Sequence, residues 1–145
     1  MKRSLRRLLR IRELVEDRAR LDLERKSAEM QALGQFATGQ RQLALRIRAD
    51  AVEDLTGQET TTGKWKMKID DAEATQQKGV RLGALAEAAK PAVAQARDEL
   101  VERRRERRQA EILHAAAMRE EERHQVRQDQ NRTDDWFQSR SKNRN

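Results

Sequence analysis

The sequence predicts an all-α protein in which two long helices form an antiparallel coiled-coil hairpin, the second helix being the longer. Charged residues make up 39% of the 145-residue chain and aromatic residues 3%, which leaves too little apolar material for a compact interior. Leu, Ile, Val and Ala recur at spacings of three, four and their sums, the pattern of a helix with one buried face. One break separates two such stretches. Chains of this kind bind, brace or transmit, and they rarely catalyse.

The first helix is predicted over residues 2–56. Its apolar stripe consists of Leu5, Leu8, Val15, Ala19, Met30, Leu33, Ala37, Ala44, Ile47, Ala51 and Leu55. The stripe ends at a segment with two Gly, three consecutive Thr and no apolar side chain, which predicts a loop over residues 57–63. A short loop between two long helices favours an antiparallel hairpin.

The second helix is predicted over residues 64–138, with a frayed tail over 139–145 and the whole chain as a single domain. Its apolar stripe consists of Trp65, Ile69, Ala72, Leu82, Leu85, Ala89, Val93, Ala96, Leu100, Ala110, Leu113 and Ala117. Pro91 falls inside this helix, where a proline removes one hydrogen bond. Either it kinks the helix, or it lies in the first turn of a restarted helix.

A turn centred near Thr60 would place residue i opposite residue 120 minus i. This register sets the basic run 103–108 beside Glu13, Glu16 and Asp17. It also predicts the apolar and small-residue contacts Leu8 with Ile112 and Leu113, Ala19 with Leu100, and Gly39 with Gly79 and Gly83. Residues after about 119 have no partner from the first helix, so the second helix is expected to project alone toward its C-terminal end.

Composition and motifs narrow the classes of function. The net charge of +7 favours acidic partners, and the absence of Cys excludes a disulfide framework. No apolar run approaches the roughly 20 residues of a membrane span. His114 and His124 are ten residues apart, too far to share a metal ion, and no phosphate-binding Gly-rich loop is present. We therefore expect no enzyme activity, no catalytic residues, no metal and no cofactor.

Six residues are candidates for partner binding. Arg6, Arg7 and Arg10 belong to an N-terminal basic cluster with no acid before Glu13, which forms either a solvated face or a docking surface for an acidic protein rim. Trp65 either closes the hairpin tip by packing on Leu55 or contacts a partner. The other two candidates are Trp136 and Phe137, which have no intramolecular partner in the predicted register and therefore favour an interface.

The two ends of the chain resemble the FliJ/YscO family. The segment 6–19 reads RRLLRIRELVEDRA, the segment 119–123 reads REEER, and the segment 134–137 reads DDWF. Together with chain length and the two-helix plan, these carry the resemblance over about the first 25 and last 35 residues. The family comprises small stalk proteins of flagellar and virulence type III secretion systems, including the Hrp branch of plant-associated bacteria.

The resemblance implies a non-enzymatic cytoplasmic protein located peripherally at the inner-membrane secretion apparatus. The joined termini, with Arg6, Arg7, Arg10, Trp136 and Phe137, would enter the pore of the hexameric secretion ATPase. The loop end, with Trp65, would reach the cytosolic ring of the export gate, and some family members also handle export chaperones.

The chain departs from the flagellar pattern at Asp70, Asp71 and Thr75, where flagellar members carry aromatic and aliphatic residues. This difference favours a virulence-system member. Two other functions remain open: a coiled-coil adaptor or export-chaperone-binding protein, and a basic nucleic-acid-binding rod. The second of these is not expected, because no aromatic residues lie among the arginines and no known readout module is present.

Overall fold

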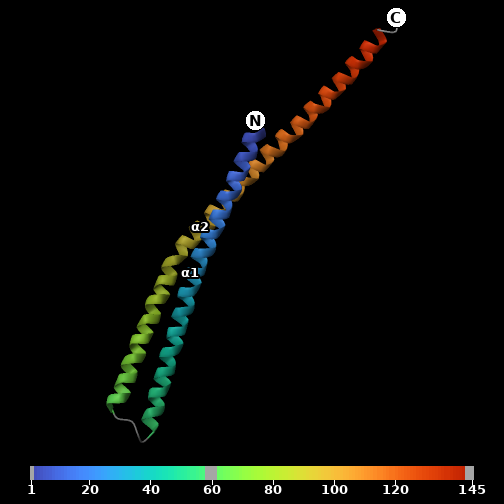
Figure 1. The fold of residues 1–145 in the computed structure, drawn as a ribbon. Coiled ribbons are helices and arrows are strands. Elements are labelled where there is room, and N and C mark those ends of the chain that lie inside the picture. Colours follow the sequence, from blue (N-terminus) through green and yellow to red (C-terminus); the bar gives the residue numbers. More distant parts are fainter. Residues whose placement is uncertain (1, 58–61, 143–145) are drawn as a thin grey trace. The chain divides into compact units, whose positions relative to one another are not determined.

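The protein consists of two long antiparallel helices that pack against each other, as the sequence predicted. A computed structural model describes residues 2–57 and 62–142. Helix α1 spans Lys2–Thr56 and helix α2 spans Thr62–Lys142 (Figure 1). Within those ranges there is no strand. The fold is therefore an all-α helical hairpin.

The helix ends differ in part from those expected. Helix α2 begins two residues before residue 64 and continues four residues past residue 138. The predicted frayed tail is thus helical through Lys142, with the Ser139 hydroxyl donating to the Trp136 carbonyl at 2.9 Å. Residues 58–61 of the predicted loop and 143–145 of the predicted tail lie outside the described residues.

The C-terminal end of α1 is closed by two hydrogen bonds on one carbonyl. The Thr56 hydroxyl and the Gly57 amide both donate to the Glu53 carbonyl, at 2.7 and 3.1 Å. Neither described glycine near the turn has a positive φ, so the end is not a left-handed glycine cap. The Thr56 hydroxyl instead adds a second hydrogen bond to a carbonyl of the last helical turn.

Internal contacts divide the chain into two units. Unit 1 comprises residues 1–18 and 101–145, and unit 2 comprises residues 19–100. Each unit pairs a segment of α1 with a segment of α2.

Unit 2 is an alanine-rich coiled coil. Its buried residues in α1 are Ala37, Ala44 and Ala51, which are seven residues apart. In α2 buried or half-buried residues recur at alternating spacings of three and four from Trp65 to Leu100, and Ile69 and Gly83 beside this series are half-buried as well. A repeat of 3.5 residues keeps one stripe of each helix against its neighbour. We call this stripe the seam.

The helices approach closely in the middle of unit 2 because small residues face each other there. A Cβ atom placed on Gly79 would lie 3.2 Å from the carbonyl oxygen of Ala37, 3.2 Å from Cγ of Arg41 and 3.3 Å from Cβ of Gln40. These distances are shorter than ordinary van der Waals contacts. The backbone of α1 thus occupies the space that a side chain at residue 79 would need.

Contacting residues agree with the predicted register. The residue numbers of Arg12 and Glu106, paired in unit 1, add to 118, and those of Lys68 and Asp54, paired in unit 2, add to 122. The expected sum of 120 falls between them. Glu16 in unit 1 contacts Arg104 and Arg107 of the basic run, as that register requires.

Several predicted positions are wrong in detail. Gly39 has no atom within 4 Å of an added Cβ, whereas Gly79 faces Ala37, Gln40 and Arg41. Residues that the apolar stripes placed on the buried face are exposed: Leu8, Leu55, Leu85 and Leu113. Glu13 is exposed as well. The cause is the strict 3.5-residue repeat of the packed positions. A residue one position away from the seam is exposed even when it lies three or four residues from another apolar residue.

Helix α2 continues through Pro91, so it does not restart there. Pro91 is exposed, seven residues after the exposed Ala84 and seven before the exposed Asp98. Glu87, whose carbonyl loses its amide donor at Pro91, is exposed as well. The seam on the other face, with Ala89 half-buried and Val93 buried, is uninterrupted.

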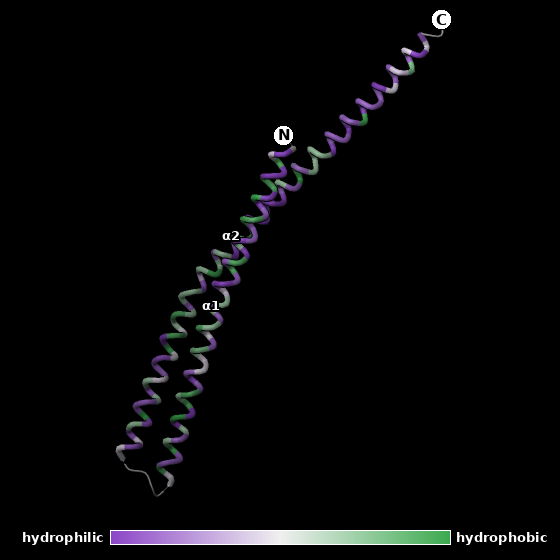
Figure 2. Tube along the Cα trace, viewed as in Figure 1, coloured by the Kyte–Doolittle hydropathy of each residue, from purple (hydrophilic) through white to green (hydrophobic). Residues whose placement is uncertain are grey.

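In unit 1 the seam ends where α1 begins. Ala110 is buried and Ala117 is half-buried, but every described residue from Arg119 to Lys142 is exposed. Continuing the repeat would give Glu121, His124, Gln128, Asn131, Asp135 and Gln138, all of them polar. Figure 2 shows that hydrophilic positions predominate along this C-terminal part of α2. We call residues 119–142 the single-helix extension; at 1.5 Å per residue it is roughly 36 Å long.

Candidate partner-binding surface

Unit 1 holds a cluster of ionic groups inside its seam. Glu16 is 2% exposed. One of its carboxylate oxygens accepts a hydrogen bond from Nε of Arg107, and the other lies 3.4 Å from Nε of Arg104. This hydrogen bond, which Arg107 donates to Glu16, is the main reason that the pKa of Arg107 is raised. A buried carboxylate requires such partners.

A second carboxylate completes this cluster. Glu106 accepts a hydrogen bond from Nη1 of Arg12 at 2.6 Å, across the two helices. It also lies 3.1 Å from Nη1 of Arg103, one helical turn away. The cluster therefore links α1 to α2 in unit 1 through Glu16, Glu106 and their arginine partners. Arginines that contact neither carboxylate lie outside this ionic cluster.

The three predicted docking arginines lie outside the ionic cluster. Arg6, Arg7 and Arg10 are exposed, and none of them forms an ion pair within residues 2–57 and 62–142. Their guanidinium groups are thus available to carboxylates of another molecule. Such exposed charges accelerate association and select an acidic surface more than they add affinity.

The aromatic pair near the end of α2 forms a small exposed cluster. Trp136 and Phe137 are 52% and 61% exposed, and their rings meet edge to face with centroids 5.1 Å apart. The guanidinium carbon of Arg140 lies 4.6 Å from the centre of the Trp136 ring, in cation–π contact. These are contacts between neighbours on one helix, so most of both aromatic surfaces stays open to a partner.

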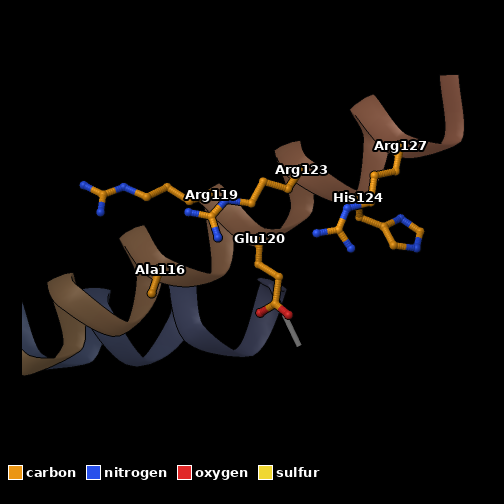
Figure 3. Close-up of a pocket in the computed structure, with 6 residues that line it drawn as sticks. All are labelled: Ala116, Arg119, Glu120, Arg123, His124 and Arg127. Carbon is orange, nitrogen blue, oxygen red and sulfur yellow. The ribbon is translucent and has the colours of Figure 1, made fainter. Parts of the chain in front are cut away.

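Between these two groups, the single-helix extension carries a shallow hollow rich in arginine. Arg119, Arg123 and Arg127 follow one another at four-residue spacing, and Glu120 and His124 line the same hollow (Figure 3). All five side chains are exposed and come from one helix. Such a surface presents charge to a partner but does not enclose a substrate.

The structure places these candidate residues in one unit but not in one patch. In the observed register, Arg6 lies across from residues near 113 of α2. Phe137 is more than 20 residues further along that helix, which corresponds to roughly 35 Å. Unit 1 therefore presents two separate surfaces, one of them basic and the other aromatic.

Trp65 belongs to unit 2 and lies in the seam as its first residue in α2. It is half-buried, and its indole Nε1 is buried with no hydrogen-bond partner among the described residues. Leu55, the residue expected to cover it, is 59% exposed. The position in the seam favours the packing role over the contact role.

Sequence reasoning missed the Arg12–Glu106 pair and the seam position of Glu16. A strict seven-residue count would have placed Glu16 in the seam, because Leu9, Glu16, Leu23 and Met30 occupy the same heptad position. That count does not identify the Arg12–Glu106 pair. No group of three or more His, Asp or Glu residues in the described ranges could hold a metal ion. Neither described helix has a stretch apolar and long enough to cross a bilayer.

No family model, curated protein or solved structure matches the chain.

Proposed function

We propose that this protein is a non-enzymatic stalk of a bacterial type III secretion ATPase complex. Unit 1 would enter the pore of the ATPase hexamer, and the loop end of unit 2, with Trp65, would approach the cytosolic ring of the export gate. Export chaperones are further proposed partners. In this role the protein acts mechanically: an asymmetric helical shaft in a hexamer favours ordered ATP turnover around the ring.

The observation that carries the proposal is the single-helix extension of α2. All described residues from 119 to 142 are exposed, including the aromatic pair at its end. An isolated helix of this length is marginal in water, because helices in proteins gain most of their stability from a packed face. Enclosure by a partner would supply that packing, and a ring-shaped partner suits a helix exposed on all sides.

The second support is the separation of internal from external charge in unit 1. The arginines of the seam cluster contact Glu16 and Glu106, whereas Arg6, Arg7 and Arg10 face outward. Replacing the outward group would therefore leave the internal ion pairs intact. This separation makes the docking role testable without unfolding the hairpin.

The test is the rate of ATP hydrolysis by the cognate hexameric ATPase with and without the protein. We expect the R6E/R7E/R10E variant to lose stimulation, and rising salt to weaken stimulation by the unaltered protein. The matched control is R46E/R81E/R97E, which changes charge equally at three exposed arginines of unit 2 and should stimulate normally.

Equal stimulation by both triple variants would refute the docking assignment. If the protein leaves the ATPase unaffected but binds DNA or RNA in a salt-sensitive manner, the nucleic-acid-binding function replaces it. If it affects neither but binds a partner helix or an export chaperone, the adaptor function is correct.

A further inference from the structure

Unit 2 contains large exposed apolar side chains that the proposed stalk function does not use. Phe36 is 64% exposed, Leu85 is 56% exposed and Leu43 is 44% exposed. Single exposed apolar residues are ordinary, but contiguous groups mark interfaces. Whether these three belong to one surface follows from the heptad geometry.

Contacts across the helices identify the two edges of the coiled coil. On one edge, Arg48 donates a hydrogen bond to Gln76, and a Cβ on Gly83 would lie 2.9 Å from Nη2 of Arg41. These four residues each follow a seam position by one residue. The seam positions that these residues follow alternate with a second set, which includes Ala37, Ala44, Gly79 and Ala86, and in an antiparallel coiled coil the residues that precede this second set share the opposite edge. Phe36, Leu43 and Leu85 each precede one.

The opposite edge therefore has two rows of side chains, one on each helix. On α1 the row is Glu29, Phe36, Leu43 and Asp50, and on α2 it is Asp71, Lys78, Leu85 and Ala92. By the observed register, Phe36 lies across from Leu85, and Asp50 lies across from Asp71. We call the surface formed by Glu29, Phe36, Leu43, Asp50, Asp71 and Leu85 the apolar edge.

Charge distinguishes this edge from the rest of the molecule. Three acids and the single Lys78 give the eight row positions a net charge of −2, although the whole chain carries +7. Glu29, Asp50 and Asp71 form no ion pair within the described ranges of the chain. Glu29 lies at one end of the apolar centre, and Asp50 and Asp71 lie together at the other.

We propose that the apolar edge docks an amphipathic helix of another protein, with an apolar face and Lys or Arg at both ends. Apolar side chains of a third helix would pack against Phe36, Leu43 and Leu85, as in helical bundles. The distance from Glu29 to Asp50 corresponds to roughly 30 Å of helix, or about 20 residues of partner. The basic ends would neutralise the acids at both ends of the edge.

A second copy of this chain fits the edge poorly. In a two-fold pair the same surface meets itself in the opposite direction, so the acids at one end would face the acids at the other. Like charges brought together across an interface oppose association. The partner helix must therefore differ from the edge in charge, and this inference does not rest on the proposed ATPase role.

The probe is a pair of synthetic 21-residue helical peptides with the same leucine-bearing face. One carries Lys at both ends and the other carries Glu, and binding to the full-length protein is measured by fluorescence anisotropy. We expect the Lys peptide to bind at least about tenfold more tightly than the Glu peptide, with the difference shrinking as salt rises.

The matched variants locate the binding. F36S/L85S should weaken binding of the Lys peptide by about tenfold or more, because apolar anchors carry most interface energy. The control L45S/V80S removes side chains that are 63% and 55% exposed on the side of Arg48 and Gln76, away from the apolar edge, and should bind normally. E29Q/D50N/D71N should reduce the preference for Lys over Glu, whereas the control E24Q/E53Q/E73Q should retain it.

Equal binding of both peptides, absence of binding, or equal loss in F36S/L85S and its control would overturn the proposal. Self-association of the unaltered protein that F36S/L85S abolishes, measured by sedimentation equilibrium, would also overturn it, because a second copy would then cover the edge. Circular dichroism of each variant verifies that the helices are intact.

Discussion

The glycines of unit 2 provide a direct test of how closely the two helices approach. Four of them, Gly34, Gly39, Gly79 and Gly83, lie in the interior of a helix and away from its first turn, where replacing Gly with Ala normally stabilises a protein by about 1 kcal/mol through helix propensity. Their surroundings differ sharply. Gly34 and Gly39 have no atom within 4 Å of an added Cβ, whereas Gly79 faces the backbone of α1.

These surroundings predict opposite outcomes. Gly34→Ala and Gly39→Ala should each stabilise by about 1 kcal/mol, and together by about 2 kcal/mol, because nothing obstructs the new methyl groups. Gly79→Ala adds a methyl group 3.2 Å from the Ala37 carbonyl, which cannot move without shifting α1. Overpacking costs about 1–3 kcal/mol, so the net effect should range from about zero to about 2 kcal/mol of destabilisation.

At Gly83 an added methyl group would meet a mobile side chain, whereas at Gly79 it would meet backbone. Its added Cβ would lie 2.9 Å from Nη2 of Arg41 and 3.9 Å from Cβ of Ala37. The guanidinium is the far end of a flexible chain and can swing away, so Gly83→Ala should still stabilise, by about 0.5–1 kcal/mol.

The assay is urea unfolding followed by circular dichroism at 222 nm, with free energies from linear extrapolation. If Gly79→Ala stabilises as much as Gly39→Ala, the helices do not approach closely at residue 79. If Gly34→Ala and Gly39→Ala destabilise, the outer face of α1 is packed against something that the described chain does not provide.

Two further predictions concern unit 2 and the single-helix extension. The pKa of Lys68 is raised above its ordinary value of 10.5, chiefly by its hydrogen bond to Asp54, so the pair contributes stability below pH 10.5 and loses it as pH rises through the raised value. Urea midpoints of the unaltered protein and Lys68→Met should therefore differ at pH 8 and converge at higher pH; a difference that stays constant with pH would contradict the ion pair. Deleting residues after Asp129 should leave the thermal unfolding of the hairpin unchanged, and amides 119–142 of the full-length protein should exchange rapidly, because this part of α2 has no packed face. Unfolding of the truncated protein would mean that Trp136 and Phe137 pack on the hairpin.

The sequence alone determined the helical class, the two-helix plan and the register. Few aromatics and many charges exclude a compact core, and apolar spacing at helical periods requires long helices with one buried face. The contact of Glu16 with the basic run and the exposure of residues after 119 follow from that register. The start of α1 and its end at Thr56 also agree with the apolar pattern and its break.

Only the tertiary structure decided which residues occupy the seam and which form the edges. Leu8, Leu85 and Leu113 satisfy three- and four-residue steps as well as true seam residues do, yet they are exposed, since the packed stripe follows a strict 3.5-residue repeat. Likewise Gly39 and Gly79 are both mid-helix glycines, and the approach of α1 at 3.2 Å distinguishes them. The spacing of apolar residues along the sequence indicates that a helix has a buried face. The orientation of that face, and hence what remains exposed on either side, depends on the position of the neighbouring helix.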